Sequence, residues 1–145
     1  MKKSLLYLFA CLFCLSLTVA CSDDDYDFKG TPDNPVTSVE IKNGNVVSKT
    51  DNGEMAEVTY YNFVNGKLDN IKTEVHYKSG KLADAAYTIW KEMASSEDKE
   101  QMSVKKDGSV IKIEYKKGFE DFDYYGDLTA QQLAAVLSGD YSGWY

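Results

Sequence analysis

The chain has 145 residues, and its 23 acidic and 16 basic side chains give a formal charge of −7. Every basic residue is a lysine, because the sequence contains no arginine. Phosphate groups are bound by clustered positive charge and by the bidentate guanidinium group, so this composition argues against nucleic acid and phosphorylated ligands as partners.

Residues 1–20 have the features of a secretory signal peptide. Lys2 and Lys3 form a basic start, and the stretch from Leu5 to Ala20 is almost wholly apolar. This stretch is shorter than the roughly 20 apolar residues of a membrane-spanning helix, and it ends at a small residue. We therefore expect cleavage after Ala20, which removes both lysines and no acid and changes the formal charge from −7 to −9.

The expected cleavage site carries a family resemblance. Residues 17–21 (LTVAC) resemble the lipobox of bacterial lipoproteins, with Thr18 at the position where leucine is usual. Residues 8–11 (LFAC) also fit the pattern, but cleavage there leaves an apolar core of only about half a dozen residues. The resemblance implies that Cys21 becomes the lipidated N-terminus, bearing acyl chains such as palmitate. The other two cysteines lie in the leader, so the expected mature chain has no free thiol.

An acidic run follows the cysteine directly and consists of Ser22, Asp23, Asp24 and Asp25. This run resembles the export signal of surface lipoproteins in the Bacteroidetes. The resemblance implies a lipid-anchored protein of the outer membrane, displayed at the cell surface, with the membrane as the partner of its N-terminus. The alternative is that these residues are only a solvated acidic spacer.

Residues 21–35 form the expected lipidated tether. The segment has few apolar residues and contains Gly30, Pro32 and Pro35, so it has little with which to offset the entropy of ordering. We predict a flexible, extended arm, on which Tyr26 and Phe28 are the side chains able to pack against a domain. Residues 22–35 reach roughly 45 Å when fully stretched, at about 3.3 Å per residue. Residues 36–145 are then enough for a single domain with its own core.

Three turn dipeptides divide the next part of the chain into hairpins. Asn-Gly at 43–44 and at 65–66, and Asp-Gly at 107–108, tolerate the positive φ of tight turns. The predicted strands cover 36–42, 46–50, 54–64, 67–78, 102–106 and 109–116. Apolar and polar side chains alternate in the strand over 71–78, so one face of the sheet is predicted to be apolar and the other polar.

Two predicted helices can cover the apolar face. Apolar residues recur at helical spacing over 81–94, although residues 78–81 (KSGK) also fit a hairpin turn into another strand. Thr129 and Gln132 form a capping box, and Gly139 stands where a left-handed C-terminal cap would fall. The predicted fold is therefore α+β, an antiparallel sheet of about six strands built from hairpins, with one face covered by two helices.

Catalytic chemistry has little support in the sequence. His76 is the single histidine and falls on the predicted polar face, where a solvated strand residue is the ordinary interpretation. Nucleophilic hydrolysis needs a base that is aligned by a third group, and zinc needs several histidine or cysteine ligands. We therefore assign no catalytic residue and no cofactor.

Residues 119–127 (FEDFDYYGD) form the densest acidic and aromatic segment. Asp121, Asp123 and Gly126 fit the first, third and sixth positions of a calcium loop, and Asp127 supplies a further carboxylate. The fifth and twelfth positions lack the ligands that such a loop needs, so the metal pattern is incomplete. The alternative is a loop or edge strand whose phenylalanines enter the core while its acids stay in water.

Five aromatic residues form a candidate ligand surface: Tyr124, Tyr125, Tyr141, Trp144 and Tyr145. Flat rings beside carboxylates suit neutral glycans, because the rings stack on sugar faces and the oxygens accept hydrogen bonds from hydroxyl groups. The alternative is that the same rings serve core packing and docking of the C-terminal tail.

Three classes of function remain open. The first is a non-enzymatic binding or accessory module on the cell surface, for a glycan or a protein ligand. The second is a structural or protein-interaction domain that uses a sheet edge or an open sheet face, where extended partners add strands. The third is a hydrolase with carboxylates roughly 5 to 10 Å apart, drawn from Glu120, Asp121, Asp123 and Asp127. The sequence predicts neither the ligand nor the oligomeric state.

Overall fold

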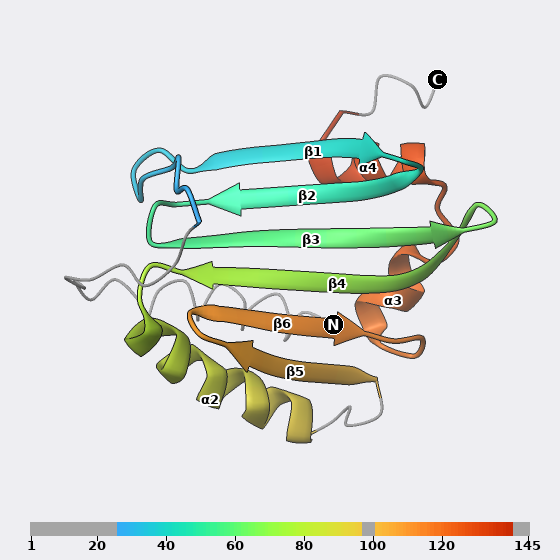
Figure 1. The fold of residues 1–145 in the computed structure, drawn as a ribbon. Coiled ribbons are helices and arrows are strands. Elements are labelled where there is room, and N and C mark those ends of the chain that lie inside the picture. Colours follow the sequence, from blue (N-terminus) through green and yellow to red (C-terminus); the bar gives the residue numbers. More distant parts are fainter. Residues whose placement is uncertain (1–25, 97–100, 141–145) are drawn as a thin grey trace.

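The computed structural model describes residues 26–96 and 101–140 (Figure 1). Its six-stranded sheet is antiparallel throughout, in the order β1-β2-β3-β4-β6-β5. The strands are β1 (Val36–Lys42), β2 (Asn45–Asp51), β3 (Met55–Val64), β4 (Lys67–Tyr77), β5 (Met102–Asp107) and β6 (Val110–Tyr115). The helices are α2 (Gly80–Ser96), α3 (Glu120–Tyr125) and α4 (Ala130–Ser138). The mixed α+β class is confirmed, whereas the leader, residues 21–25 and residues 141–145 lie outside the described residues.

The hairpin turns follow the dipeptides found in the sequence. Asn43 and Gly44 have φ values of 53° and 79°, and Asn65 and Gly66 have 53° and 76°. Two consecutive positive φ values are typical of the type I′ turn, whose twist matches that of the flanking strands. The third turn is shifted by one residue from the prediction: Asp107 pairs with Val110, so the loop is 108–109, with a φ of 61° at its glycine.

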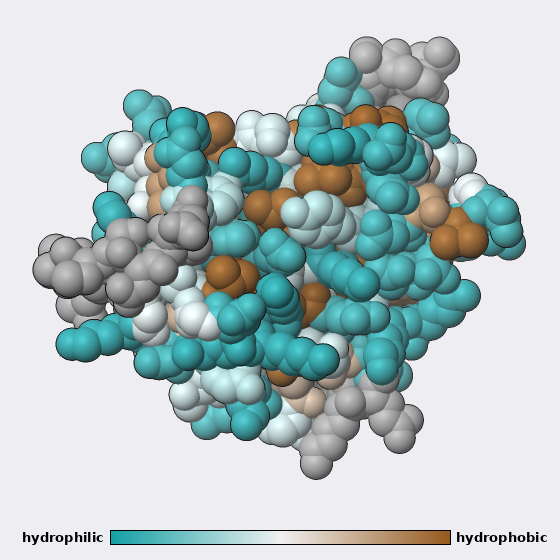
Figure 2. Space-filling model, in the orientation of Figure 1, coloured by the Kyte–Doolittle hydropathy of each residue, from teal (hydrophilic) through white to brown (hydrophobic). Residues whose placement is uncertain are grey.

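The two sides of the sheet differ as the alternation in β4 predicts. Ile71 and Val75 are buried, with 3% and 1% of their surface exposed, whereas Lys72 between them is exposed. We call the side that carries Ile71 and Val75 the core face, and the side that carries Lys72 the outer face. The strand registers place Val46, Ile111 and Ile113 on the core face as well. Figure 2 shows mostly hydrophilic side chains with separate apolar islands.

Helix α2 confirms the helix predicted over 81–94 and shows that the alternative hairpin turn is wrong. Its start is fixed by Ser79, whose hydroxyl accepts a hydrogen bond from the backbone N–H of Leu82 at 3.3 Å. A serine in this position replaces one of the backbone partners that the first helical turn lacks. The helix buries Ala86 and Trp90 and contacts β4, β5 and β6.

Helix α4 forms as its sequence signals predict, whereas α3 was not expected. The Thr129 hydroxyl accepts from the Gln132 N–H, and the Gln132 side chain accepts from the Thr129 N–H, which confirms the capping box. Gly139 ends α4 in the left-handed conformation. Residues 120–125 are helical rather than a loop or edge strand, and Phe122 on this helix is buried. The described residues therefore contain three helices, one more than predicted.

Candidate interaction surface

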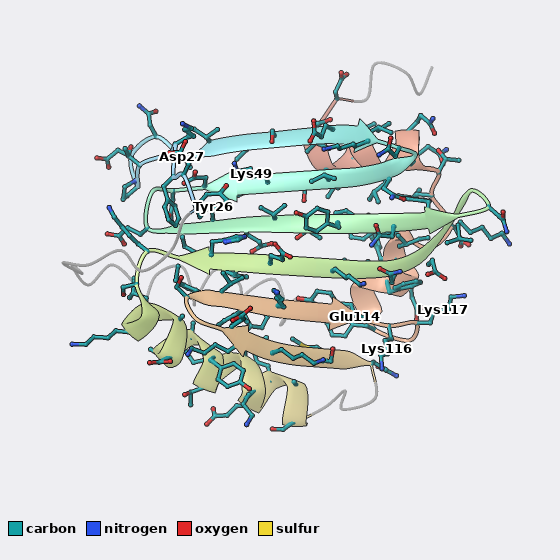
Figure 3. All side chains as sticks on the ribbon, in the orientation of Figure 1. Tyr26, Asp27, Lys49, Glu114, Lys116 and Lys117 are labelled. Atoms are coloured by element: carbon teal, nitrogen blue, oxygen red, sulfur yellow. The ribbon has the colours of Figure 1, made fainter. Side chains whose placement is uncertain are left out.

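Residues 26–28 of the predicted tether lie against the outer face of the sheet. The Tyr26 ring packs on His76, with the ring centroids 4.6 Å apart, and it contacts Phe28 edge to face at 4.8 Å. Lys49 places its ammonium group 4.8 Å from the centre of the Tyr26 ring (Figure 3). The side chain of His76 is only 17% exposed and lies 3.4 Å from the Glu74 carboxylate. His76 is therefore a covered residue, and the interpretation of it as a solvated strand residue is wrong.

The backbone fixes this arm beside the end of β2. Asp51 is fully buried, and its carboxylate accepts hydrogen bonds from the N–H groups of Lys29 at 2.7 Å and Gly53 at 2.8 Å. A Cβ atom on Gly30 would lie 1.9 Å from the carbonyl oxygen of Asp51, so only glycine permits this close approach. The packed part of the chain thus begins at or before Tyr26, earlier than the predicted boundary at residue 36.

The docked arm changes the electrostatics of its neighbours. The neighbouring Tyr26 side chain raises the pKa of Lys49, and the partial burial of the ammonium group acts in the opposite direction. Burial raises the pKa of Tyr60, and the negative charge of Glu74 raises it further. A cation over an aromatic ring at a solvent-accessible site gains about 0.5–1 kcal/mol. This cluster therefore holds the arm in place.

The predicted ligand residues are only partly brought together. Tyr124 is 69% exposed, whereas Tyr125 is half-buried and packs edge to face on Tyr61 at 5.9 Å. Tyr124 and Tyr125 contact one another, with centroids 5.1 Å apart. The remaining predicted rings, Tyr141, Trp144 and Tyr145, lie outside the described residues. The structure thus supports one exposed tyrosine rather than a described aromatic patch.

Among the described side chains, the residues predicted for a metal site or a hydrolase site do not form such a site. Asp123 and Asp127 are exposed, and the side chains of Glu120 and Asp121 lie outside the description. Among the described residues, no group of three or more histidine, cysteine or acidic side chains is placed to hold a metal ion. Asp123 and Gly126 belong to α3 and its C-terminal end, so these positions do not form the open loop that wraps a calcium ion.

Glu57 is a chemically distinct residue that the sequence interpretation missed. Its register places the carboxyl group on the core face, opposite Thr50 and Val75. Burial raises the pKa of Glu57 to about 7, and a weak hydrogen bond from Thr59 acts in the opposite direction. The alternation in β3 could have predicted this position, because Glu57 shares its side with Met55 and Thr59. Its titration near neutrality links the stability of this part of the sheet to pH.

The two edge strands of the sheet are protected to different degrees. β5 carries Lys105 and Lys106, and the Lys106 ammonium lies 2.6 Å from Asp84 on α2, which packs beside this edge. β1 has no proline and no lysine before Lys42. Val36 and Ile41 on β1 are 42% and 45% exposed. β1 carries two charges, Glu40 and Lys42, in seven residues, whereas β5 carries three in six. Exposed apolar edge strands with few charges are the ones that pair with other chains.

The register shows which backbone groups β1 presents. A two-residue loop joins β1 to β2, so Lys42 and Asn45 form the hydrogen-bonded pair that closes the hairpin. Hydrogen bonding alternates along an antiparallel pair, so Thr37, Val39 and Ile41 direct their N–H and C=O groups away from β2. β1 is the last strand on its side of the described sheet (Figure 1). Three residues therefore offer six backbone groups to an added strand.

The comparisons with known proteins leave the family open. The chain matches no protein-family model, and no match to curated proteins or solved structures reaches significance. In the described part of the chain, no helix has the length and apolar character needed to cross a membrane.

Proposed function

We propose that the mature chain is a non-enzymatic interaction module, held on the outer membrane at the cell surface by lipidated Cys21, which binds an extended polypeptide at β1. One observation carries the binding part of this proposal. β1 is an exposed edge with lysine only at its end, whereas β5 carries two lysines, one of which forms an ion pair with α2. We call β5 the guarded edge. Strand addition gains affinity from main-chain hydrogen bonds and specificity from alternate side chains.

The packing of the helices supports this use of the sheet. α2 contacts β4, β5 and β6, α3 contacts β4, and α4 contacts β1 and β2. The sheet residues in the buried core, such as Val46, Val75 and Ile113, share the core face. In this proposal the helices cover the core face alone, so partners reach the outer face and the β1 edge.

The docked arm supports a position close to the membrane. Only residues 22–25 separate Cys21 from the docked Tyr26. Five residue steps span at most about 17 Å. A lipid on Cys21 therefore holds the domain near the bilayer surface, and not at the end of a roughly 45 Å arm.

The edge proposal is tested with matched proline variants of the anchored chain. Val39→Pro removes an outward N–H of β1, and Val104→Pro removes an outward N–H of β5, while both leave the hydrogen bonds to the neighbouring strand in place. The probe is a panel of synthetic decapeptides with alternating β-branched residues, and binding is followed by biolayer interferometry. We expect binding that is lost in Val39→Pro and retained in Val104→Pro. Equal binding by both variants, or no binding to the unsubstituted chain at a surface density too low for two copies to meet, would overturn the edge proposal.

The anchor is tested independently of the edge. Cells that express the chain are fed an alkyne analogue of palmitate, and surface display is measured by protease treatment of intact cells. We expect Cys21→Ala to lose both the label and the membrane fraction. Cys14→Ala is the matched control and retains both, because this cysteine precedes the expected cleavage site. A label that survives Cys21→Ala contradicts the anchor.

A second candidate function follows from Tyr124, which is 69% exposed beside Tyr125. An exposed ring of this kind is able to stack on a neutral sugar. The test is a glycan array read with the intact chain and with Tyr124→Ala, using Tyr87→Ala on α2 as the control. Glycan binding that is lost only in Tyr124→Ala supports this candidate, and an array without any binding removes it.

A further inference from the structure

We propose that the polypeptide bound at β1 is the β1 strand of a second copy of this chain, paired antiparallel about a two-fold axis at Val39. The inference rests on the proposed function, because it names the partner of the same edge. Two six-stranded sheets then join into one continuous sheet across the pair.

The backbone groups of β1 are self-complementary in one register. With Val39 opposite Val39 of the partner subunit, Thr37 lies opposite Ile41 of the partner subunit, and the reverse pair follows by symmetry. All three residues with outward-facing groups are then used. Each becomes a hydrogen-bonded pair that exchanges two bonds, so the seam forms about six main-chain hydrogen bonds.

The side chains of β1 favour the same register. Thr37, Val39 and Ile41 all lie on the core face, where β-branched residues pack well across strands. An axis at Glu40 would bring Glu40 against Glu40 of the partner subunit, and like charges directly opposite one another destabilise a strand pair. An axis at Ile41 places Val39 beyond the partner strand, opposite its turn, and leaves Thr37 unpaired. The axis at Val39 is the one that satisfies all the outward groups.

The position of the arm agrees with this symmetry. The two-fold axis of an antiparallel edge pair is perpendicular to the sheet, so the outer faces of both copies point the same way. Tyr26 lies against the outer face, where it contacts His76 and Lys49. Both docked arms therefore leave from one side of the joined sheet, and two lipid anchors reach the same bilayer without reorientation.

The small size of the seam explains why anchoring matters. A stable complex in solution usually buries at least about 1,200 Å², and pairing of one short edge strand buries less. The net negative charge of each copy also opposes association in solution. Confinement on a membrane raises the effective concentration of one copy around another, so that weak contacts become populated. The pair is therefore expected on membranes and not in dilute detergent solution.

The test is disulfide formation between two cysteine variants of the lipidated chain in vesicles. The Cα atoms of Thr37 and Ile41 of the partner subunit lie about 5.5 Å apart in a hydrogen-bonded pair, within the range that a disulfide spans. Two Thr37 residues, or two Ile41 residues, lie about 13 Å apart along the seam. We expect Thr37→Cys mixed with Ile41→Cys to form dimers on non-reducing gels, whereas either variant alone forms at least tenfold less.

The controls separate this inference from the proposed function. Lys105→Cys, on the guarded edge, is expected to form no dimer alone or with either β1 variant. Equal cross-linking by single and mixed β1 variants, or none by the mixture, overturns the paired register. In one outcome the Thr37→Cys and Ile41→Cys mixture forms no dimer, but the decapeptides bind and Val39→Pro abolishes their binding. The second copy is then the wrong partner, and the proposed function stands. If both experiments fail, both are wrong.

Discussion

The two edge strands of the sheet, β1 and β5, differ in how well they are protected against pairing with another chain. β5 carries two lysines, and Lys106 pairs with Asp84 of the adjacent helix α2. β1 carries its lysine only at the last position and leaves Val36 and Ile41 more than two-fifths exposed. Both strands present outward backbone groups and both contact a helix, α4 at β1 and α2 at β5, so the difference lies in the side chains. An edge with fewer protecting charges than its counterpart supports the strand pairing proposed for β1.

The strongest change in the pH dependence of stability is expected at Glu57 on β3, whose side chain is partly buried. Glu57 has an ordinary pKa of 4.5 and a folded pKa of about 7, so folding takes up a proton between these values. Stability is therefore highest below about pH 4.5 for this group and decreases as pH rises to 7, by up to about 3 kcal/mol. Glu57→Gln should flatten this decrease in urea unfolding curves measured from pH 5 to 8.

Glu74→Gln is the matched control on the neighbouring strand, because it removes an acid from the outer face. We expect its curves to keep the decrease with pH. A Glu57→Gln variant with the same pH dependence as the unsubstituted chain would show that this acid is solvated.

The next effect tests the assignment of inward and outward backbone groups on β1. Glu40→Pro removes an N–H that bonds to β2, and an unsatisfied buried carbonyl costs about 1–3 kcal/mol. Val39→Pro removes an outward N–H and is expected to cost about 1 kcal/mol less. Thermal unfolding of both variants measures the difference, and equal costs would show that the register is misassigned.

A third effect concerns the arm beside the β1 end of the sheet. Gly30→Ala cannot keep its approach to the Asp51 carbonyl, so the arm moves and the Lys29–Asp51 hydrogen bond, of about 1 kcal/mol, is lost. Limited proteolysis should then cut near Lys29. Gly44→Ala, whose added methyl group meets no neighbouring atom, should leave the arm protected. Equal protection of the arm in both variants would contradict the close approach of Gly30.

The smallest effect on stability is expected for substitution of Ile41, an exposed side chain on the edge strand β1. Ile41→Lys gives β1 the kind of charge that guards β5, and a surface substitution of this kind changes stability by about 0.5 kcal/mol or less. The same variant should lose association on vesicles, measured by fluorescence energy transfer between labelled copies. Unchanged transfer would remove the functional contrast between the edges.

The sequence predicted the elements whose signals are local. The Asn-Gly turns and the Thr129 capping box depend on residues within four positions of one another, and both formed as predicted. The position of Asp-Gly at 107–108 shifted because Gly108 takes the first central place of its turn. Helix α3 was missed because six residues carry too little periodicity to separate a helix from a loop.

The candidate surface could be predicted only in part, because it depends on strand order. The composition of β1 is visible in the sequence, but its place at the edge follows from which strands pair, including the β4–β6 contact across α2 and β5. The docking of Tyr26 on His76 joins residues 50 positions apart, and no local pattern signals it. The burial of Glu57 could have been found from the alternation in β3 alone.

Amide hydrogen exchange of the anchored chain tests the central claim, that β1 is a pairing edge, most directly. Peptides covering Thr37, Val39 and Ile41 are compared by mass spectrometry at low and high protein density on vesicles, with β5 peptides as the internal reference. Pairing at β1 predicts exchange in β1 that slows at least tenfold with density while β5 exchange stays constant. Fast, density-independent exchange in β1, or equal slowing at both edges, would contradict it.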